Sequence, residues 1–414
     1  MSGLQPVRGT HDLFPADMRR HRRVIDTARA VAERYGYGEI ATPIFEFSEV
    51  FQRTLGDTSD IVTKEMYSFT DRGGDSITLR PEYTAGVARA FISGGLTNQL
   101  PLKVFCHGPM FRYERPQKGR LRQFHQIDVE LLGVAQPQAD IEVIALGHDI
   151  LRELGIAENC TLELNTLGDT ASRHAYRAVL VEYFQAHRDR LSEDSRTRLE
   201  RNPLRILDSK DKGDREVIAD APSFEQHLNA ESVAFFATVK AGLEVLGIAY
   251  HINPRLVRGL DYYCHTAFEF TTQALGAQGT VMGGGRYDGL IETMGGPATP
   301  GIGWAAGIER LAMLIAEPAP SPRPLAVVPL GEAAEAQALA IAQTLRRAGF
   351  VVDSSYGGNL KRRLQRANRV QARAAVILGE DELKRSAAAV RDLDSGEQGE
   401  VALDRLEEYL ARFR

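Results

Sequence analysis

The chain has 414 residues, of which 43% are hydrophobic and 25% charged, and this composition excludes a disordered or fibrous protein. Its length exceeds that of one ordinary core, so two or three domains are expected. The net charge of −5 excludes a protein that is basic as a whole, so any nucleic-acid partner has to bind local basic patches.

Membrane spans, secretory signals and cysteine patterns indicate the cellular location of a protein. No apolar run reaches the roughly 18 residues of a membrane span, and the first residues lack the layout of a secretory signal. Cys106, Cys160 and Cys264 are odd in number and widely spaced, which argues against a disulfide framework and a zinc site. We therefore expect a cytoplasmic protein with no membrane partner and no resident metal.

The first expected elements are a helix and a strand. Pro15 is placed to begin the helix, and Gly36 is a plausible stop. Apolar residues recur at helical spacing at Met18, Ile25, Ala28, Ala32 and Tyr35. A strand is predicted over Ile40 to Phe47, and Pro43 within it favours an edge or interface position.

A second strand and helix are predicted over Ser76 to Ala90. Ile77 and Leu79 indicate a short strand, and Thr84 begins the helix. Glu82 lies at the junction between them, where a carboxylate can face a pocket. The alternative is that Glu82 only stabilises the positive N-terminal end of the helix.

The residues from Gly108 to Gly133 predict a long β-hairpin, because two apolar runs enclose a loop with proline and glycine. The loop carries four basic residues, Arg115, Lys118, Arg120 and Arg122. Arginine pairs well with phosphate oxygens, so the loop suggests binding to a polyphosphate. On the outgoing strand, Gln126 and Glu130 lie four residues apart and therefore on one face.

This hairpin carries a family resemblance. The sequence FRYERPQKGRLRQFHQ, residues 111–126, resembles motif 2 of class II aminoacyl-tRNA synthetases and is close to that of bacterial histidyl-tRNA synthetases. The preceding helix and proline-bearing strand resemble motif 1, which implies a homodimer.

Further blocks follow in chain order. Asp140 to Leu154 predicts a helix and Thr161 to Asn165 a strand, whereas residues 169–250 resemble the helical insertion of this family. RGLDYY, residues 258–263, followed by T-x-F-E, resembles the block peculiar to histidyl-tRNA synthetases. Residues 281–290 predict a glycine loop, and the glycines of residues 300–314 lead into a helix with Glu309 and Arg310 that resembles motif 3.

The C-terminal part predicts a separate small domain. Residues 317–324 are rich in proline and indicate a linker. Strands and helices then alternate, which predicts a small, mainly parallel sheet, and the domain resembles an anticodon-binding domain. A helix expected over Asn359 to Arg373 has arginines along one face, which either bind RNA or form a solvated surface.

The resemblance implies a fold and an activity. The fold is α/β, with a class II catalytic domain over residues 1–320, built on an antiparallel sheet flanked by helices, and an anticodon-binding domain over residues 325–414. The activity is histidine–tRNA ligase, with L-histidine, ATP and tRNA(His) as substrates and Mg²⁺ accompanying ATP. The alternative is the non-catalytic regulatory subunit of ATP phosphoribosyltransferase, which shares the catalytic fold.

The resemblance also implies roles for individual residues. It assigns catalysis to Arg112 and Arg258. It assigns ATP binding to the same two arginines with Arg120, Phe124 and Arg310, and histidine binding to Glu82, Tyr83, Thr84, Gln126, Glu130, Tyr262, Tyr263 and Tyr287. Contacts with tRNA are expected from Gln117, Arg362, Arg366 and Arg369.

Overall fold

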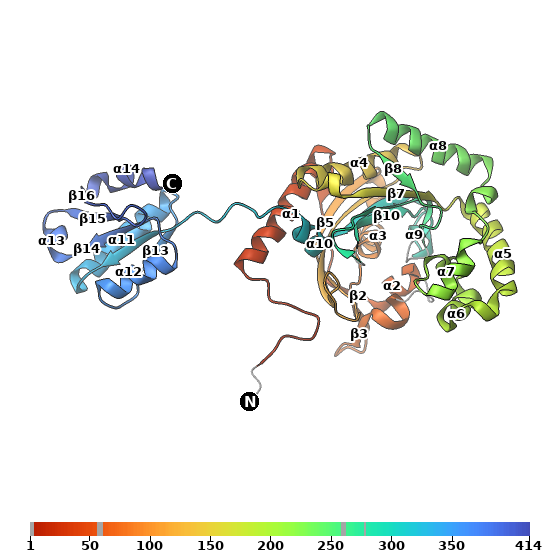
Figure 1. Ribbon diagram of the computed structural model, residues 1–414, viewed down its shortest axis with the longest axis horizontal. Coiled ribbons are helices and arrows are strands. Elements are labelled where there is room, and N and C mark those ends of the chain that lie inside the picture. Colours follow the sequence, from red (N-terminus) through yellow and green to blue (C-terminus); the bar gives the residue numbers. More distant parts are fainter. Residues whose placement is uncertain (1–3, 56–60, 258–261, 277–278) are drawn as a thin grey trace. The chain divides into compact units, whose positions relative to one another are not determined.

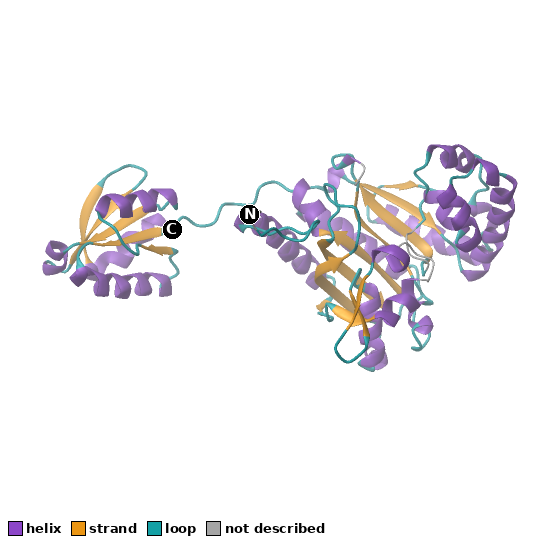
Figure 2. Ribbon diagram, turned by 90° about the horizontal axis from the view of Figure 1, so that it is seen from below, coloured by secondary structure: helices purple, strands orange, loops and turns teal. Residues whose placement is uncertain are grey.

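The computed structural model describes residues 4–55, 61–257, 262–276 and 279–414 (Figures 1 and 2). The chain divides into two compact units, Met1–Pro318 and Ala319–Arg414. Each unit has hydrophobic clusters of its own. Among the described residues, no helix has both the length and the apolar character needed to cross a membrane.

The first unit is built on an eight-stranded sheet with helices packed against it (Figure 2). Its inner strand pairs are antiparallel, and only the outermost pair at each edge is parallel, which confirms the predicted antiparallel sheet. In spatial order the strands are β1 (Gly38–Glu39), β5 (Leu102–Phe111), β6 (Gln123–Leu132), β11 (Gly301–Gly307), β10 (Thr280–Arg286), β9 (Cys264–Thr271), β7 (Thr161–Thr166) and β8 (Tyr250–Ile252).

Strand alternation divides this unit into two cores. In β6, Ile127 and Val129 face the larger core, whereas Leu132 belongs to a smaller one. The larger core holds the helices α1 (Pro15–Arg34), α4 (Gln138–Glu153), α8 (Ala230–Val245) and α10 (Ile308–Leu314). The smaller core and its neighbouring cluster hold α2 (Ser48–Leu55), α3 (Thr84–Ser93) and α9 (Leu290–Thr293).

Helix α1 begins at Pro15 as predicted, but its buried face is rotated from the predicted stripe. Met18 is 38% exposed, whereas His21 is only 5% exposed. The helix therefore turns the polar side chains of His21 and Thr27 inward together with Val24 and Val31, which an apolar periodicity does not detect.

The strand predicted over Ile40 to Phe47 is shorter in the structure. Only Phe45–Phe47 form β2, and residues 40–44 link it to the edge strand β1. Pro43 lies in this link, where its missing N–H removes no ladder hydrogen bond. Strand β2 belongs to a three-stranded antiparallel sheet with β4 (Ser76–Leu79) in the centre and β3 (Tyr67–Thr70) at the other edge.

The predicted glycine loop over residues 281–290 is wrong, because residues 280–286 form the central strand β10. Strand β11 was missed for the same reason, since its glycines indicated a loop. Residues 283–285 do not adopt positive φ angles. The glycines of β11 instead make room for neighbouring side chains. A Cβ at Gly301 would overlap the ring of Tyr287, and one at Gly303 would overlap the carboxylate of Glu130.

The helical insertion has a core of its own, formed by residues such as Tyr176, Leu180 and Ile206. Its helices are α5 (Thr170–Ala186), α6 (Glu193–Arg201) and α7 (Lys212–Ala219), whereas α8, which was predicted within the insertion, packs on the main core beside α4 (Figure 1).

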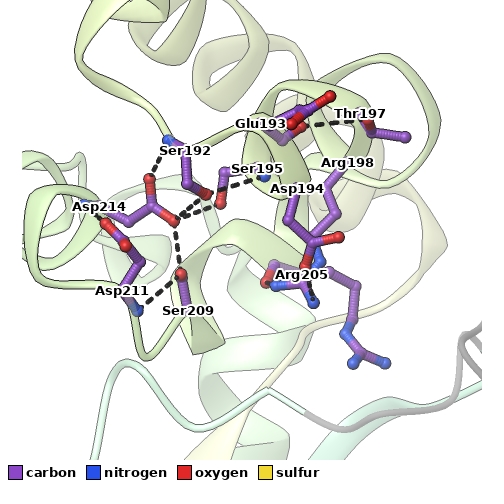
Figure 3. A network of polar contacts seen from close by, with 10 residues as sticks. All are labelled: Ser192, Glu193, Asp194, Ser195, Thr197, Arg198, Arg205, Ser209, Asp211 and Asp214. Carbon is purple, nitrogen blue, oxygen red and sulfur yellow. Dashed lines mark hydrogen bonds and ion pairs between the residues drawn. The ribbon is translucent and has the colours of Figure 1, made fainter.

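A buried carboxylate, Asp214, ties the insertion together (Figure 3). It accepts hydrogen bonds from the hydroxyls of Ser192, Ser195 and Ser209 at 2.8, 2.6 and 2.5 Å and from the backbone N–H of Ser192 at 2.7 Å. Burial opposes its ionisation, but these hydrogen bonds lower the pKa of Asp214. The carboxylate therefore holds α6 and α7 together as an anion.

The second unit contains a five-stranded sheet with two parallel and two antiparallel pairs, so the prediction of a mainly parallel sheet is wrong. The fifth strand follows a tight turn and was not predicted. The strands are, in spatial order, β13 (Val352–Ser354), β12 (Leu325–Pro329), β14 (Ala374–Leu378), β15 (Ala387–Asp392) and β16 (Gln398–Ala402). The helices are α11 (Glu332–Arg347), α12 (Leu360–Arg369), α13 (Glu380–Lys384) and α14 (Leu406–Leu410), so α12 ends before Arg373.

Candidate active site

A cavity of about 360 Å³ opens in the first unit between the β5–β6 hairpin, the strands β10 and β11, and the turn that precedes α3. It gathers residues from segments more than 200 positions apart in the chain. The predicted site residues that line this cavity are Glu82, Thr84, Arg112, Arg120, Phe124, Gln126, Tyr262, Tyr263 and Arg310.

Three arginines bring positive charge to the cavity. The Nε of Arg112 donates to the carbonyl of Pro81 at 2.9 Å, and its guanidinium lies 5.2 Å from the ring centroid of Phe124. Arg310 donates to the carbonyls of Gly119 and Thr280 at 3.0 and 2.6 Å, so it joins the hairpin loop to β10. Burial and the positive charges of Arg120 and Arg112 lower the pKa of Arg310, although Glu114 opposes this. An anion in this cavity would relieve their repulsion.

A set of acidic and hydroxyl groups adjoins the arginines. Glu82 is 5% exposed and accepts the backbone N–H groups of Thr84 and Ala85, both at 2.8 Å. The turn at the start of α3 therefore holds this carboxylate in one orientation. Burial raises the pKa of Glu82, while these hydrogen bonds and the charge of Arg112 oppose the rise.

Glu130 adjoins the cavity through Thr84 and Gly303, which both line it. It is 1% exposed and accepts hydrogen bonds from the Thr84 hydroxyl at 2.5 Å and from the Tyr287 hydroxyl. Gly303 on the neighbouring strand β11 pairs with it in register. Gly303 lines the cavity and has no side chain, which leaves the room that this carboxylate occupies.

Three tyrosines pack around this carboxylate. The ring centroids of Tyr262 and Tyr263 lie 4.6 Å apart, and Tyr262 meets Tyr287 edge-on at 5.7 Å. Tyr83 does not line the cavity: it is 1% exposed, stacks on the guanidinium of Arg80, and donates to the carbonyl of His107 at 2.7 Å. Arg258, the other predicted catalytic residue, lies outside the described residues.

The predicted tRNA contacts lie elsewhere. Gln117 is exposed in the loop of the hairpin, where it pairs with Arg120. In the second unit, Arg362 and Arg369 of α12 are exposed, whereas Arg366 is engaged by the Asp353 carboxylate at 2.8 and 3.0 Å.

Sequence reasoning missed Asp128, which lies on β6 between Gln126 and Glu130 and shares their face. It is 1% exposed, and its Oδ2 has no hydrogen-bond partner among the described residues. Burial, with the charges of Glu130 and Glu82, raises the pKa of Asp128 well above its ordinary value. The spacing of two residues from Gln126 was the signal that could have identified it.

These buried acids predict a pH dependence of stability. Burial raises the pKa of Glu130 to about 8, although hydrogen bonds from Thr84 and Tyr287 oppose the rise. Between its ordinary value of 4.5 and this pKa, the folded chain keeps a proton that the unfolded chain has lost. Stability therefore falls as pH rises through this window, by at most about 1.4 kcal/mol per pH unit for this group.

The matching measurement compares the thermal midpoint of the wild type with that of Glu130→Gln, which is neutral at every pH. We expect the midpoint of the wild type, relative to the variant, to decrease steadily between pH 5 and pH 8. A constant difference across this range would contradict the raised pKa.

Comparison with known proteins decides the family. A family model described as Histidyl-tRNA synthetase matches residues 9–311, and one described as Anticodon binding domain matches residues 325–413. A Rhodospirillum rubrum protein named Histidine--tRNA ligase is 64% identical over 414 residues, which cover 100% of both chains. The chain belongs to the histidyl-tRNA synthetase family.

Solved structures agree with this assignment. The apo histidyl-tRNA synthetase of S. aureus is 35% identical, with a TM-score of 0.82 over 98% of this chain and 99% of that one. A Bacillus halodurans structure described as an ATP phosphoribosyltransferase regulatory subunit/histidyl-tRNA synthetase is 21% identical, with a TM-score of 0.67 over 91% of this chain and 98% of that one. At that identity the likeness shows the fold alone, and the full-length match to a ligase does not favour the regulatory-subunit alternative.

Proposed function

We propose that this histidyl-tRNA synthetase activates L-histidine with ATP and then transfers the histidyl group to the 3′ end of tRNA(His). The observation that carries this proposal is a single cavity in which Arg112, Arg120 and Arg310 adjoin the Glu82–Thr84 turn and the Glu130 carboxylate. The cations suit a polyphosphate, and the carboxylates suit an ammonium and an imidazole ring.

In the first step, a carboxylate oxygen of histidine attacks the α-phosphorus of ATP. A carboxyl–phosphate bond forms, the bond from the α-phosphorus to the bridging oxygen breaks, and pyrophosphate leaves. Two anions approach each other in this step, so neutralisation of charge dominates the barrier. Arg112 bridges the carboxylate and the α-phosphate, Arg310 and Arg120 hold the outer phosphates, and Phe124 stacks against adenine.

Histidine is held by the second set of groups. The oxygen atoms of Glu82, Thr84 and Gln126 accept hydrogen bonds from the α-ammonium group of histidine. Glu130 and Tyr263 bind the two nitrogens of its imidazole ring. Tyr262 and Tyr287 form the wall of the histidine pocket. The buried oxygen of Gln126 has no hydrogen-bond partner among the described residues, which supports a role in ligand binding. An amino acid without two ring nitrogens would leave buried polar groups of the pocket unpaired, and the free-energy cost of these unpaired groups excludes it as a substrate.

Mg²⁺ fits the chemistry of the cavity, because Glu114 and Glu269 line it and provide the oxygen ligands that this ion prefers. When bound, the ion would neutralise charge on the leaving pyrophosphate.

The experiment that tests this function is histidine-dependent exchange of pyrophosphate into ATP, followed by charging of tRNA(His). We expect exchange with histidine and none with phenylalanine or glutamine. A chain that binds histidine but shows no exchange would instead be a regulatory or sensing protein.

The second unit is proposed to bind the anticodon arm through the exposed arginines of α12. Arg362→Ala combined with Arg369→Ala should raise the KM for tRNA(His) in charging roughly tenfold, because phosphate contacts are lost. Pyrophosphate exchange, which needs no tRNA, should stay at the wild-type rate. Arg385→Ala with Arg405→Ala removes the same charge elsewhere in this unit and provides the control; an equal effect of that pair would contradict a specific site.

A homodimer is proposed because the first unit exposes large apolar side chains on its three-stranded sheet. Phe45, Phe47 and Phe69 are 58%, 53% and 50% exposed, and neighbouring Ile44 is 43% exposed. Surfaces of this kind mark protein contacts. Ile44, Phe45 and Phe47 belong to the strand that resembles motif 1, and Phe69 lies on β3 of the same sheet.

The dimer is tested with Phe45→Asp combined with Phe47→Asp, which should halve the molar mass measured by light scattering because two charges would be buried in the contact. Val245→Asp with Leu246→Asp changes two residues, 86% and 53% exposed, near the end of α8 and should leave the mass unchanged. A wild-type mass for both double variants would place the contact elsewhere.

A further inference from the structure

A cluster of metal-ligating side chains lies outside the residues assigned above. It is formed by His21 of α1, His125 of β6 and Glu309 of α10, and one ligand atom from each lies within 4.8 Å of the other two. His125 and Glu309 already contact each other: Nδ1 is 2.8 Å from Oε1, and the backbone N–H of His125 donates to both carboxylate oxygens at 3.0 Å.

Of the three side chains in this cluster, His21 gives the strongest indication of a ligand. It is 5% exposed, yet none of the hydrogen bonds among the described residues uses a ring nitrogen of His21. Its ring meets His125 edge-on, with 5.5 Å between centroids. The His21 ring is therefore buried next to two other side chains that can ligate a metal, and a ring nitrogen remains available.

The cluster opens on space for a further ligand. His21, Glu309 and Asp17 line a second cavity of about 570 Å³, which is bounded on another side by Gly119 and Leu121 of the hairpin loop. This cavity provides room for a water molecule, and Asp17 offers a carboxylate.

We propose that His21, His125 and Glu309 form a binding site for a divalent transition-metal ion of the Zn²⁺ class, with a fourth ligand from the adjoining cavity. Two imidazoles and one carboxylate form a ligand set that suits Zn²⁺ and Co²⁺. Mg²⁺ prefers oxygen ligands, so the Mg²⁺ of the ATP reaction should not fill this site.

The position of the site has a structural consequence. It joins α1, β6 and α10, which lie far apart in the sequence of the first unit. His125 lies between Phe124 and Gln126, and Glu309 precedes Arg310, so a bound ion would hold residues next to those that line the candidate active site. Occupancy should therefore raise the thermal midpoint of the first unit.

The test uses the full chain after chelation and dialysis, titrated with Co²⁺ and followed by visible absorption, and with Zn²⁺ followed by calorimetry. We expect one equivalent per chain, intense bands of four-coordinate Co²⁺, and no displacement by millimolar Mg²⁺. His21→Gln and His21→Phe should each weaken binding at least tenfold. Thermal unfolding measured without metal shows whether these variants remain folded. In His21→Phe, the phenylalanine ring fills the space of the imidazole ring.

His174→Gln, a substitution of an exposed histidine on α5, is the matched control and should bind as the wild type does. Either of two results would overturn the proposal. One is unchanged Co²⁺ affinity in both folded His21 variants, and the other is displacement of Co²⁺ by Mg²⁺.

Discussion

Arg112→Ala should lower kcat/KM for histidine-dependent ATP–pyrophosphate exchange by about 10²- to 10³-fold, the usual cost of removing one preorganised donor from a developing anion. Arg112 is anchored by the carbonyl of Pro81 and lies over the ring of Phe124. It is therefore positioned before ATP arrives, and its charge needs no reorganisation during the reaction. The loss should appear mainly in kcat, because the charge is most needed when the two anions meet.

The control for this prediction is Arg115→Ala. Arg115 belongs to the same hairpin loop and is exposed, so its substitution removes the same charge from the same segment without touching the cavity. Arg115→Ala should leave exchange within about twofold of the wild type, since exposed charges contribute little. Equal losses in both variants would show that only the overall charge of the loop matters.

Glu130→Gln should raise the KM for histidine roughly 10- to 100-fold while changing the KM for ATP little. The amide has the size of the carboxylate but offers one acceptor instead of two, and Thr84 and Tyr287 already donate to those oxygens. A buried ring nitrogen left without its hydrogen-bond partner costs a free energy of binding of this magnitude. Equilibrium binding of histidine and of ATP, measured separately, distinguishes this effect from general damage.

Tyr287→Phe provides the comparison for Glu130→Gln. It removes one donor to Glu130 and keeps the buried ring in place. It should therefore weaken histidine binding less than Glu130→Gln does. If both variants bind histidine as the wild type does, the carboxylate behind Gly303 is a structural group and the ring nitrogens are recognised elsewhere.

The local chemistry of the site could be predicted from sequence where it is contiguous. The hairpin of residues 108–133, the carboxylate at the start of α3 and the Glu309–Arg310 pair were each visible in short stretches. The buried face of α1 could not be predicted in this way, because the polar residue His21 faces inward. The strands β10 and β11 could not be predicted either, because glycine ordinarily indicates a turn. In these strands glycine is required by neighbours, Glu130 and Tyr287, that are distant in sequence.

The order of residues alone determined the family, the hairpin and the kinds of charge that the protein can present, since these depend on neighbours along the chain. Only tertiary structure decided which of these groups meet: β11 lies between β6 and β10, so Arg310 meets the hairpin loop and Glu130 is covered by a glycine. It likewise turned His21 toward His125 and Glu309. Strand pairing joins segments according to how their side chains pack across the sheet, and that packing has no signature within any single segment.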